Sequence, residues 1–285
     1  MKTSKKNIIA ICYDFDKTLS PDDMQAQGYI QSLGYTVEDF WKETNEMAKE
    51  YKMDGNLAYM LKMVQESGVL TKEDLIRHGE KVRLFPGVTT WFQRINEYAE
   101  QNGITVEHYI ISSGIREMIE GTKIAKAGSF KEIFANSFYY DKEGKAMWPA
   151  QMVNYTNKTQ FLFRIEKGIL DVTDPGVNEY QPDEDSRIPF RNMVYIGDSD
   201  TDVPCMKLVT MRGGHAIGVY DPKTKNKDKV YKMIEGKRIR YFCPANYGAG
   251  SEIENLLKMI IDKTVATEAL ENKYMRDLAE IRSWG

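Results

Sequence analysis

The stretch Ile8-Ile-Ala-Ile-Cys-Tyr-Asp-Phe-Asp-Lys-Thr18 decides how the rest of the chain is interpreted. Its first six residues form a nearly continuous apolar run, which is typical of a central parallel strand covered on both faces. Asp14 and Asp16 follow directly, and the Thr18 hydroxyl comes two residues later. Two carboxylates at this spacing can share one phosphoryl centre, where one attacks phosphorus and the other moves a proton. An acidic turn after a strand has the same pattern, so the motif alone leaves both interpretations open.

Strand-like and helix-like segments alternate along the rest of the chain. Further strands are expected at 105–111, 131–139, 193–196, 217–220 and 239–242, and helices at 88–101, 115–127, 158–168 and 251–285. This alternation predicts an α/β fold with a doubly wound parallel sheet. Ligands of such sheets bind at the carboxyl ends of the strands, so polar residues that follow strand ends are the candidates for function.

Residues 20–84 differ from this alternating pattern. They form helical patches rich in Met, Gln, Glu and Lys, with no convincing strand, and Phe85-Pro86-Gly87 ends the segment. We therefore expect two units, a core made of residues 1–19 and 85–285 and a helical unit of residues 20–84 inserted after the first strand.

Length, charge and cysteine content limit the possible classes of protein. A chain of 285 residues can bury a core without disulfides or structural metals. Its net charge of −3 shows no basic excess for nucleic acid or an anionic membrane. No stretch approaches the roughly 18 apolar residues of a membrane span, and three cysteines indicate reduced thiols. We expect a soluble, cytoplasmic protein, a monomer or homodimer, that binds neither nucleic acid nor membranes.

Three further polar signals stand at predicted strand ends or helix starts. Ser112-Ser113-Gly114 opens a helix, where a hydroxyl and free amides can hold an anion, although a plain serine cap is commoner. Lys158 also begins a helix and could neutralise a phosphate, although a lone lysine is usually a solvated surface group. Asp198 and Asp202 follow the strand at 193–196, and their oxygens suit Mg²⁺. An acidic turn that starts a helix is the alternative for these two residues.

In this order, the motifs resemble those of the haloacid dehalogenase-like hydrolase superfamily, in its phosphoserine phosphatase-like branch. The resemblance spans residues 8–250 and implies that residues 20–84 are a helical cap over a phosphatase site. The matching residues are Asp14 to Thr18, Ser112, Lys158, Gly197-Asp198 with Asp202, and Phe85-Pro86-Gly87 at the return from the cap to the core.

The resemblance also implies roles for the charged residues. Asp14 would be the nucleophile that forms an aspartyl-phosphate, and Asp16 would protonate the leaving oxygen and then deprotonate water. Mg²⁺ would be held by Asp14, the backbone carbonyl of Asp16 and Asp198. Lys158 would offset negative charge in the transition state, and Asp202 would orient metal-bound waters or Lys158. A carboxylate at the position of Asp16 favours phosphate esters over the substrates of dehalogenases.

The substrate would be a small phosphorylated metabolite. By the same resemblance, the phosphate would be bound by Thr18, Ser112, Ser113 and Gly114. Several residues of the cap could face the leaving group, although packing or solvent contact is the commoner fate of such residues: Asp22, Asp23, Met24, Gln25 and Arg77. The chain offers no motif that identifies the metabolite.

Other functions remain open at this stage. A phosphotransferase of the same fold would use the same residues. A signalling module that accepts phosphate on an aspartate, or a phosphate-binding protein without turnover, would also need the acidic cluster. The C-terminal segment carries an apolar stripe of Leu270, Tyr274, Leu278 and Ile281, which we expect to pack on the chain's own domain, with a dimer contact as the alternative.

Overall fold

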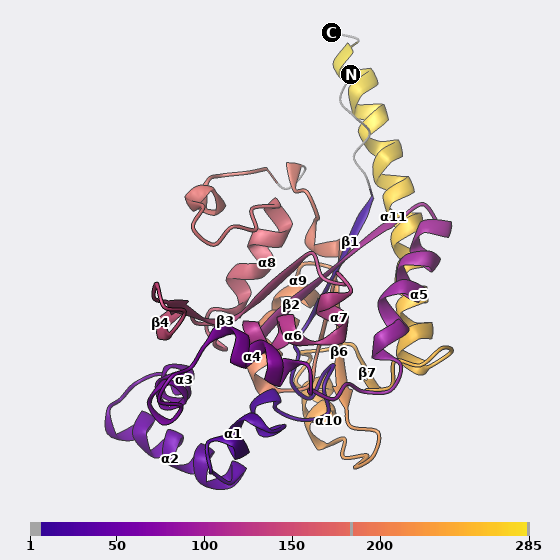
Figure 1. The fold of residues 1–285 in the computed structure, drawn as a ribbon. Helices are drawn as coiled ribbons and strands as arrows, with labels where there is room; N and C mark the ends of the chain where they lie inside the picture. Colours follow the sequence, from indigo (N-terminus) through magenta and orange to yellow (C-terminus); the bar gives the residue numbers. More distant parts are fainter. Residues whose placement is uncertain (1–6, 183–184, 284–285) are drawn as a thin grey trace.

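A seven-stranded sheet forms the centre of the computed structural model, which describes residues 7–182 and 185–283 (Figure 1). The strand order is β4-β3-β2-β1-β5-β6-β7, and every neighbouring pair is parallel except β3 and β4. The bounds are β1 Ile8–Tyr13, β2 Thr105–Ile115, β3 Glu132–Tyr140, β4 Ala146–Gln151, β5 Met193–Gly197, β6 His215–Tyr220 and β7 Tyr241–Pro244. The expected α/β fold with a mostly parallel, doubly wound sheet is confirmed.

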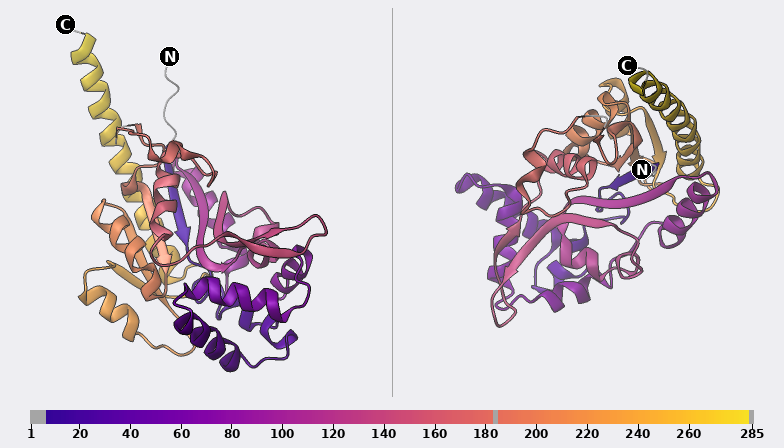
Figure 2. Two further views of the ribbon diagram at one scale, coloured as in Figure 1. Left: turned by 90° about the vertical axis from the view of Figure 1, so that its left-hand side faces the viewer. Right: turned by 90° about the horizontal axis from the view of Figure 1, so that it is seen from above.

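Helices cover both faces of this sheet (Figure 2). The helices that follow β1 in sequence are α1 Tyr29–Ser32, α2 Val37–Glu50, α3 Gly55–Glu66, α4 Lys72–Gly79 and α5 Val88–Gln101. The remaining helices are α6 Arg116–Gly121, α7 Lys123–Lys126, α8 Lys158–Lys167, α9 Val203–Met211, α10 Asp228–Glu235 and α11 Glu252–Ser283.

Strand β1 separates two hydrophobic cores. Ile9, Ile11 and Tyr13 pack into the core formed with α5 and the first half of α11. Ala10 and Cys12 point the other way, into the core formed with α8, α9 and α10. Successive side chains of a strand alternate between its faces, so a strand covered on both sides needs apolar residues at every position.

The segment 20–84 lies beyond the carboxyl end of β1, and its own ends meet. The Phe85 N–H donates a hydrogen bond to the Leu19 carbonyl oxygen at 2.8 Å, so the chain leaves and re-enters at one place. Helices α1 to α4 of the segment occupy the end of the molecule opposite the free end of α11 (Figures 1 and 2).

Several local expectations need correction. The helix expected at 115–127 is split, because Thr122 is extended and its hydroxyl caps α7 by accepting the Ala125 N–H. Strand β4 and helix α9 were not expected, and β7 begins two residues later than the strand expected at 239–242. Helix α10 was not expected either, and its Val230 is buried.

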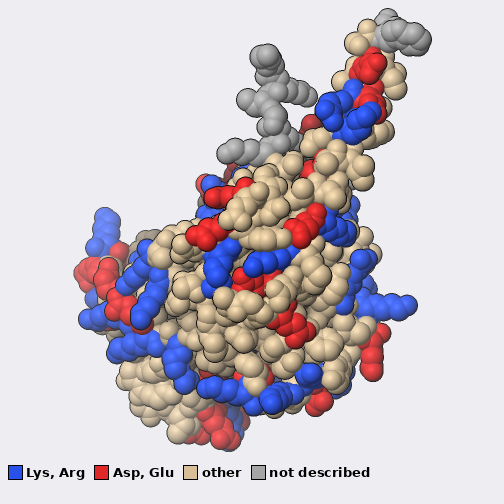
Figure 3. Space-filling model, turned by 90° about the vertical axis from the view of Figure 1, so that its right-hand side faces the viewer, with Lys and Arg blue, Asp and Glu red and all other residues tan. Residues whose placement is uncertain are grey.

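The expected packing of the C-terminal stripe on the chain's own domain is wrong. Leu270, Tyr274 and Ile281 are 73%, 59% and 66% exposed, and this end of α11 projects from the body (Figure 3). The helix has 32 residues and is about 48 Å long, whereas the six residues of β1 span about 20 Å. The sheet is therefore too short to cover the whole helix. On the face that Figure 3 shows, acidic and basic side chains are interspersed.

No helix within the described part of the chain is both long enough and apolar enough to cross a membrane.

Candidate active site

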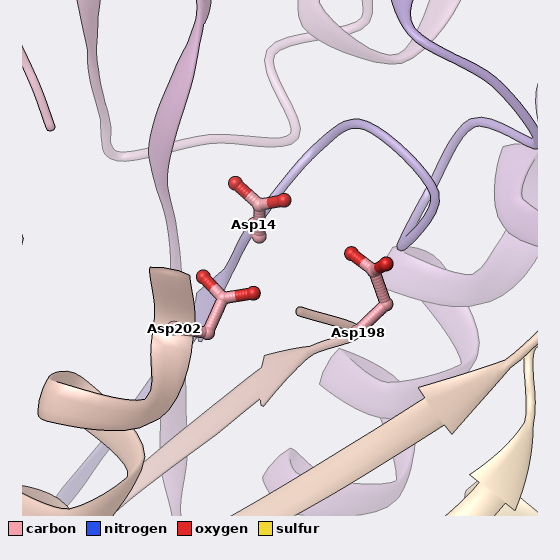
Figure 4. Close-up of side chains that lie close together, drawn as sticks. All are labelled: Asp14, Asp198 and Asp202. Carbon is pink, nitrogen blue, oxygen red and sulfur yellow. The ribbon is translucent and has the colours of Figure 1, made fainter. Parts of the chain in front are cut away.

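Three carboxylates and one ammonium gather at the carboxyl ends of β1 and β5. Lys158, at the start of α8, places its Nζ 3.0 Å from Asp14 Oδ1 and 2.8 Å from Asp202 Oδ1, and its side chain is 1% exposed. The carboxylates of Asp14, Asp198 and Asp202 turn toward a shared space (Figure 4). One oxygen from each of these three residues lies within 4.8 Å of the others.

The chemistry of this cluster fits a divalent cation. All three ligand candidates offer carboxylate oxygens, which hard cations such as Mg²⁺ or Ca²⁺ prefer. Lys158 pairs with two of the three carboxylates, and Asp198 forms no ion pair in the described part of the chain, so a further positive charge would stabilise the cluster. Asp202 is the least available of the three, because its Oδ1 accepts from Lys158 and Tyr195 and its Oδ2 accepts from Ser199.

Burial and mutual repulsion change the acidity of these groups. Burial raises the pKa of Asp14 to about 6, against the opposing effect of the Lys158 ammonium. Burial, then the carboxylates of Asp202 and Asp14, raise the pKa of Asp198 to about 8. Burial alone would lower the pKa of Lys158, but Asp14 and Asp202 outweigh it and hold that pKa above its usual value. The cluster thus holds more negative charge than its surroundings compensate.

Asp202 reaches this position because Gly197 has no side chain. A Cβ on Gly197 would lie 2.6 Å from Asp202 Oδ2, closer than real Cβ atoms approach an oxygen. The Tyr195 hydroxyl donates to Asp202 Oδ1 at 2.9 Å from the same strand. The glycine and the tyrosine that flank Ile196 therefore fix the carboxylate that holds Lys158.

Asp16 lies where the chain enters the helical segment. Its Oδ1 accepts the backbone N–H of Met24 at 2.8 Å, in the 3₁₀ helix η1 Met24–Ala26. Burial, followed by the charges of Asp23 and Asp14, raises the pKa of Asp16 well above its usual value. Gly114 lies against the Met24 side chain, and a Cβ there would lie 2.2 Å from the Met24 methyl, so a larger residue would require this methionine to move.

The Ser112-Ser113-Gly114 segment, expected to open a helix, belongs to the last residues of β2, and α6 begins only at Arg116. This segment is tied to the helical segment through its backbone. The Tyr59 hydroxyl of α3 donates to the Ser113 carbonyl oxygen at 2.7 Å. Asn136 of β3 donates its Nδ2–H to the same carbonyl at 2.7 Å and to the Tyr59 oxygen at 2.6 Å. Its Oδ1 accepts the Val153 N–H at 2.5 Å, so this buried side chain has partners on both ends. These bonds fix the direction of the Ser113 carbonyl and hence of the Ser113–Gly114 peptide.

A cavity of about 430 Å³ opens over these groups. Of the residues expected to form the site, the cavity is lined by Asp14, Asp16, Ser112, Ser113, Gly114, Lys158 and Asp198. Thr18 and Asp202 lie behind the lining, and the Thr18 hydroxyl donates to Asp198 Oδ1 at 3.4 Å. The structure therefore brings together all the expected residues, with these two one layer deeper.

The expectations for the helical segment are met only in part. Asp23 and Gln25 line the cavity. Met24 is buried against Gly114, and Asp22 is not among the lining residues. Arg77 is exposed and paired with Asp74 of its own helix, so it does not face the cavity.

Sequence comparison identifies the family to which this arrangement belongs. The family model described as haloacid dehalogenase-like hydrolase matches residues 11–207, the range that contains Asp14, Lys158 and Asp202. The chain belongs to the haloacid dehalogenase-like hydrolases. An uncharacterized protein of Borreliella burgdorferi is 30% identical over 282 residues, which cover 88% of this chain and 95% of that protein.

Solved structures of haloacid dehalogenase-like hydrolases share the fold. A HAD family hydrolase from Salmonella enterica subsp. enterica serovar Typhi matches with a TM-score of 0.57 and 17% identity, over 91% of this chain and 73% of that one. A probable phosphoserine phosphatase from Vibrio cholerae matches with a TM-score of 0.57 and 14% identity, over 93% and 68%. A phosphoserine phosphatase with an analogue of the phospho-aspartyl intermediate matches with a TM-score of 0.52 and 18% identity, over 89% and 99%.

Sequence reasoning missed several residues of this haloacid dehalogenase-like site. Tyr195 stands within an apolar strand, and Asn136 stands within another, so neither differs from its neighbours by a recognisable motif. The helices of the segment 20–84 contribute further lining residues that follow no motif: Trp41, Thr44, Asn45, Asn56 and Tyr59.

Proposed function

We propose that the protein is a Mg²⁺-dependent phosphatase that hydrolyses a small phosphorylated metabolite through an aspartyl-phosphate on Asp14. The observation that carries this proposal is the pairing of Asp14 with Lys158 at 3.0 Å in a cavity that Asp16 and the Ser112-Ser113-Gly114 segment also line. Membership in the haloacid dehalogenase-like hydrolases supports it. So does the fold shared with proteins described as phosphoserine phosphatases.

The first half of the reaction transfers the phosphoryl group to the protein. A carboxylate oxygen of Asp14 attacks phosphorus, and the bond between phosphorus and the leaving oxygen breaks. Asp16 in its acid form donates its proton to the leaving oxygen, which departs as a neutral alcohol. The Met24 N–H, which donates to Asp16 Oδ1, keeps the acid oriented.

The second half releases phosphate. Asp16, now a carboxylate, takes a proton from a water molecule, and the water oxygen attacks phosphorus. The acyl phosphate bond breaks, inorganic phosphate leaves, and Asp14 is again a free carboxylate. Lys158 stays charged throughout and offsets the negative charge that the transition states place on the phosphoryl oxygens.

Mg²⁺ would be held by Asp14, Asp198 and the backbone carbonyl of Asp16. When bound, it supplies positive charge that neutralises the phosphate and orients it for in-line attack. Asp202 would act indirectly, by holding Lys158 at 2.8 Å. Thr18 would also act indirectly, by holding Asp198 through its hydroxyl. Ser112, Ser113 and Gly114 would bind phosphate oxygens. We further propose that residues 20–84 form a cap that closes the cavity and excludes water.

Release of inorganic phosphate from p-nitrophenyl phosphate and a panel of phosphorylated metabolites tests the proposal. Wild type should turn over substrate with Mg²⁺ and not with a chelator, and Asp14→Asn should lose turnover. Asp277→Asn is the matched control, since Asp277 lies on the projecting end of α11 and pairs with Lys273. Turnover by Asp14→Asn near the wild-type rate would refute the nucleophile.

Two alternatives give different results in the same assay. A phosphotransferase would release less phosphate when an alcohol acceptor is added and would form a new phosphate ester. A phosphate-accepting or binding protein would bind metal without turnover of any ester. The cytoplasmic location and the monomeric or homodimeric state remain predictions from the sequence.

A further inference from the structure

The wall that the helical segment contributes to the cavity is almost free of charged residues. Among the described residues, its lining members come from η1, α2 and α3 or their borders. They are Asp23, Gln25, Trp41, Thr44, Asn45, Gly55, Asn56 and Tyr59. Asp23 is the single charged residue in this set, and it is already paired with Lys17 Nζ at 2.9 Å.

The uncharged members of this wall offer both donors and acceptors. An amide side chain carries one carbonyl oxygen and one NH₂ group, and a hydroxyl can donate and accept. One Nδ2–H of Asn56 is used on the Val153 carbonyl, which leaves its second N–H as a donor and its Oδ1 as an acceptor. The Thr44 hydroxyl donates to the Phe40 carbonyl, so Thr44 faces a ligand as an acceptor. Trp41 adds an aromatic ring, and its buried Nε1–H has no acceptor in the described part of the chain.

From this wall we infer that the leaving alcohol is an uncharged, hydroxyl-bearing ring, such as the sugar of a sugar phosphate or the ribose of a nucleoside monophosphate. A hydroxyl group on the ligand can donate one hydrogen bond and accept another, so it can bind both the N–H and the carbonyl oxygen of an amide side chain. An ammonium can only donate and a carboxylate can only accept, and each brings a charge that a neutral wall leaves uncompensated. The inference rests on the proposed phosphatase function.

The charged residues elsewhere in the cavity argue against an ammonium on the leaving group. Lys229, near the start of α10 and outside the helical segment, lines the cavity and would repel it. The argument against a carboxylate on the leaving group comes from the neutral wall alone. A cavity of about 430 Å³ lies within the range of about 300–1,000 Å³ typical of small-molecule sites, which suits a whole metabolite.

A substrate panel with a binding arm tests the inference. Glucose 6-phosphate, ribose 5-phosphate and adenosine 5′-monophosphate are compared with phosphoserine, phosphoethanolamine and 3-phosphoglycerate, with p-nitrophenyl phosphate as reference. At least one compound of the first group should exceed all of the second by about tenfold or more in kcat/KM, which is about 1.4 kcal/mol of discrimination. A preference for the sugar phosphates or for the nucleotide then identifies the source of the ring.

Charge on the wall should change this preference. Asn45→Asp adds a carboxylate to α2 within the lining, and the ratio of phosphoethanolamine to ribose 5-phosphate turnover should rise by about tenfold. Asn272→Asp adds the same charge on the projecting end of α11 and should leave the ratio unchanged. An unchanged ratio in Asn45→Asp would argue against a role for this wall in selection.

The outcomes separate the two proposals. Suppose that the protein turns over p-nitrophenyl phosphate and that its best metabolite is phosphoserine, phosphoethanolamine or 3-phosphoglycerate. The inference about the leaving alcohol is then wrong, and the proposed phosphatase function stands. If no ester is turned over, calorimetry with Asp14→Asn and Mg²⁺ decides. If ribose 5-phosphate or adenosine 5′-monophosphate binds at least tenfold tighter than phosphoserine, the inference about the ligand is supported even though the phosphatase function is not. If phosphoserine binds tighter, the inference is wrong.

Discussion

Tyr13 and Asp14 are neighbours in the sequence, yet they belong to two opposite kinds of buried polar network. The Trp91 Nε1–H donates to the Tyr13 oxygen at 2.9 Å, so the Tyr13 hydroxyl donates its own hydrogen to His108 Nδ1 at 3.0 Å. His108 then carries its proton on Nε2 and donates it to Asn96 Oδ1 at 3.0 Å. Every member is neutral, and each donor has its acceptor.

One residue further along, the network is ionic and incomplete. Asp14 shares Lys158 with Asp202, and Asp198 adds a third carboxylate that forms no ion pair within the described residues. A satisfied neutral network stabilises a fold and leaves nothing for a ligand to supply. A cluster with excess negative charge costs stability until a cation binds. The comparison therefore separates a satisfied neutral network at the end of β1 from a charged cluster that begins one residue after it.

The largest expected difference between the networks is in turnover. Asp14→Asn should lower kcat by on the order of 10⁴-fold, because no carboxylate remains to attack phosphorus. It should not lower the free energy of unfolding in chelator by more than about 1 kcal/mol, since it removes one of several crowded negative charges. Phosphate release and urea unfolding measure the two effects, and a large loss of stability would place Asp14 with the structural residues.

Lys158→Met should affect both turnover and stability. The buried carboxylates of Asp14 and Asp202 lose their shared cation, which should cost about 3–5 kcal/mol in the free energy of unfolding measured with chelator. Mg²⁺ should restore part of this stability, and kcat should still fall by about 10²–10³-fold. Equal stability with and without Mg²⁺ would contradict a metal site in the cluster.

Tyr13→Phe should give the opposite pattern. The Trp91 N–H loses its acceptor and His108 Nδ1 loses its donor in a buried site, which should cost about 1–3 kcal/mol. Turnover of the folded enzyme should change by less than about twofold, as no charge near phosphorus is altered. Urea unfolding and phosphate release measure the two effects. A loss of turnover without a loss of stability would contradict a purely structural role for Tyr13.

The neutral network should also respond to acid. Burial lowers the pKa of His108 to about 3, whereas an unfolded histidine has a pKa of about 6.5. Below pH 6.5 the unfolded chain therefore binds a proton that the folded chain does not, and stability falls as pH falls. Between pH 7 and 5 this contributes a loss of about 2 kcal/mol. Urea unfolding of wild type and His108→Gln at both pH values measures it, and the variant should lose about 2 kcal/mol less over this range.

The smallest expected effect concerns the hydrogen bond between α3 and the Ser112-Ser113-Gly114 segment of β2. Tyr59→Phe removes the hydroxyl that donates to the Ser113 carbonyl, while Asn136 still donates to it. Because the Ser113–Gly114 peptide is then held by one hydrogen bond less, kcat/KM should fall by about five- to tenfold. Tyr139→Phe is the control, because Tyr139 is 59% exposed on β3 and should leave kcat/KM unchanged.

The sequence by itself determined the fold class and the order of the charged residues at the site. Short apolar runs, either alternating or continuous, indicate strands. The residues that follow the strands of a parallel sheet all lie at the same edge of that sheet. For this reason Asp14, Asp16, Ser112 and Asp198 could be assigned to one site before any distance was known. Lys158 needed the resemblance to the family, because nothing local distinguishes it from other lysines.

Only the tertiary structure decided which side chains complete that site and where α11 ends relative to the sheet. Tyr195, Asn136 and Tyr59 have ordinary local surroundings, and their roles depend on partners 7 to 77 residues away in the chain. The apolar stripe of α11 has the period of a packed helix, but period specifies a face and not whether a sheet is long enough to cover it. Local sequence patterns determine the helices and strands, whereas the contacts between these elements are known only from the folded chain.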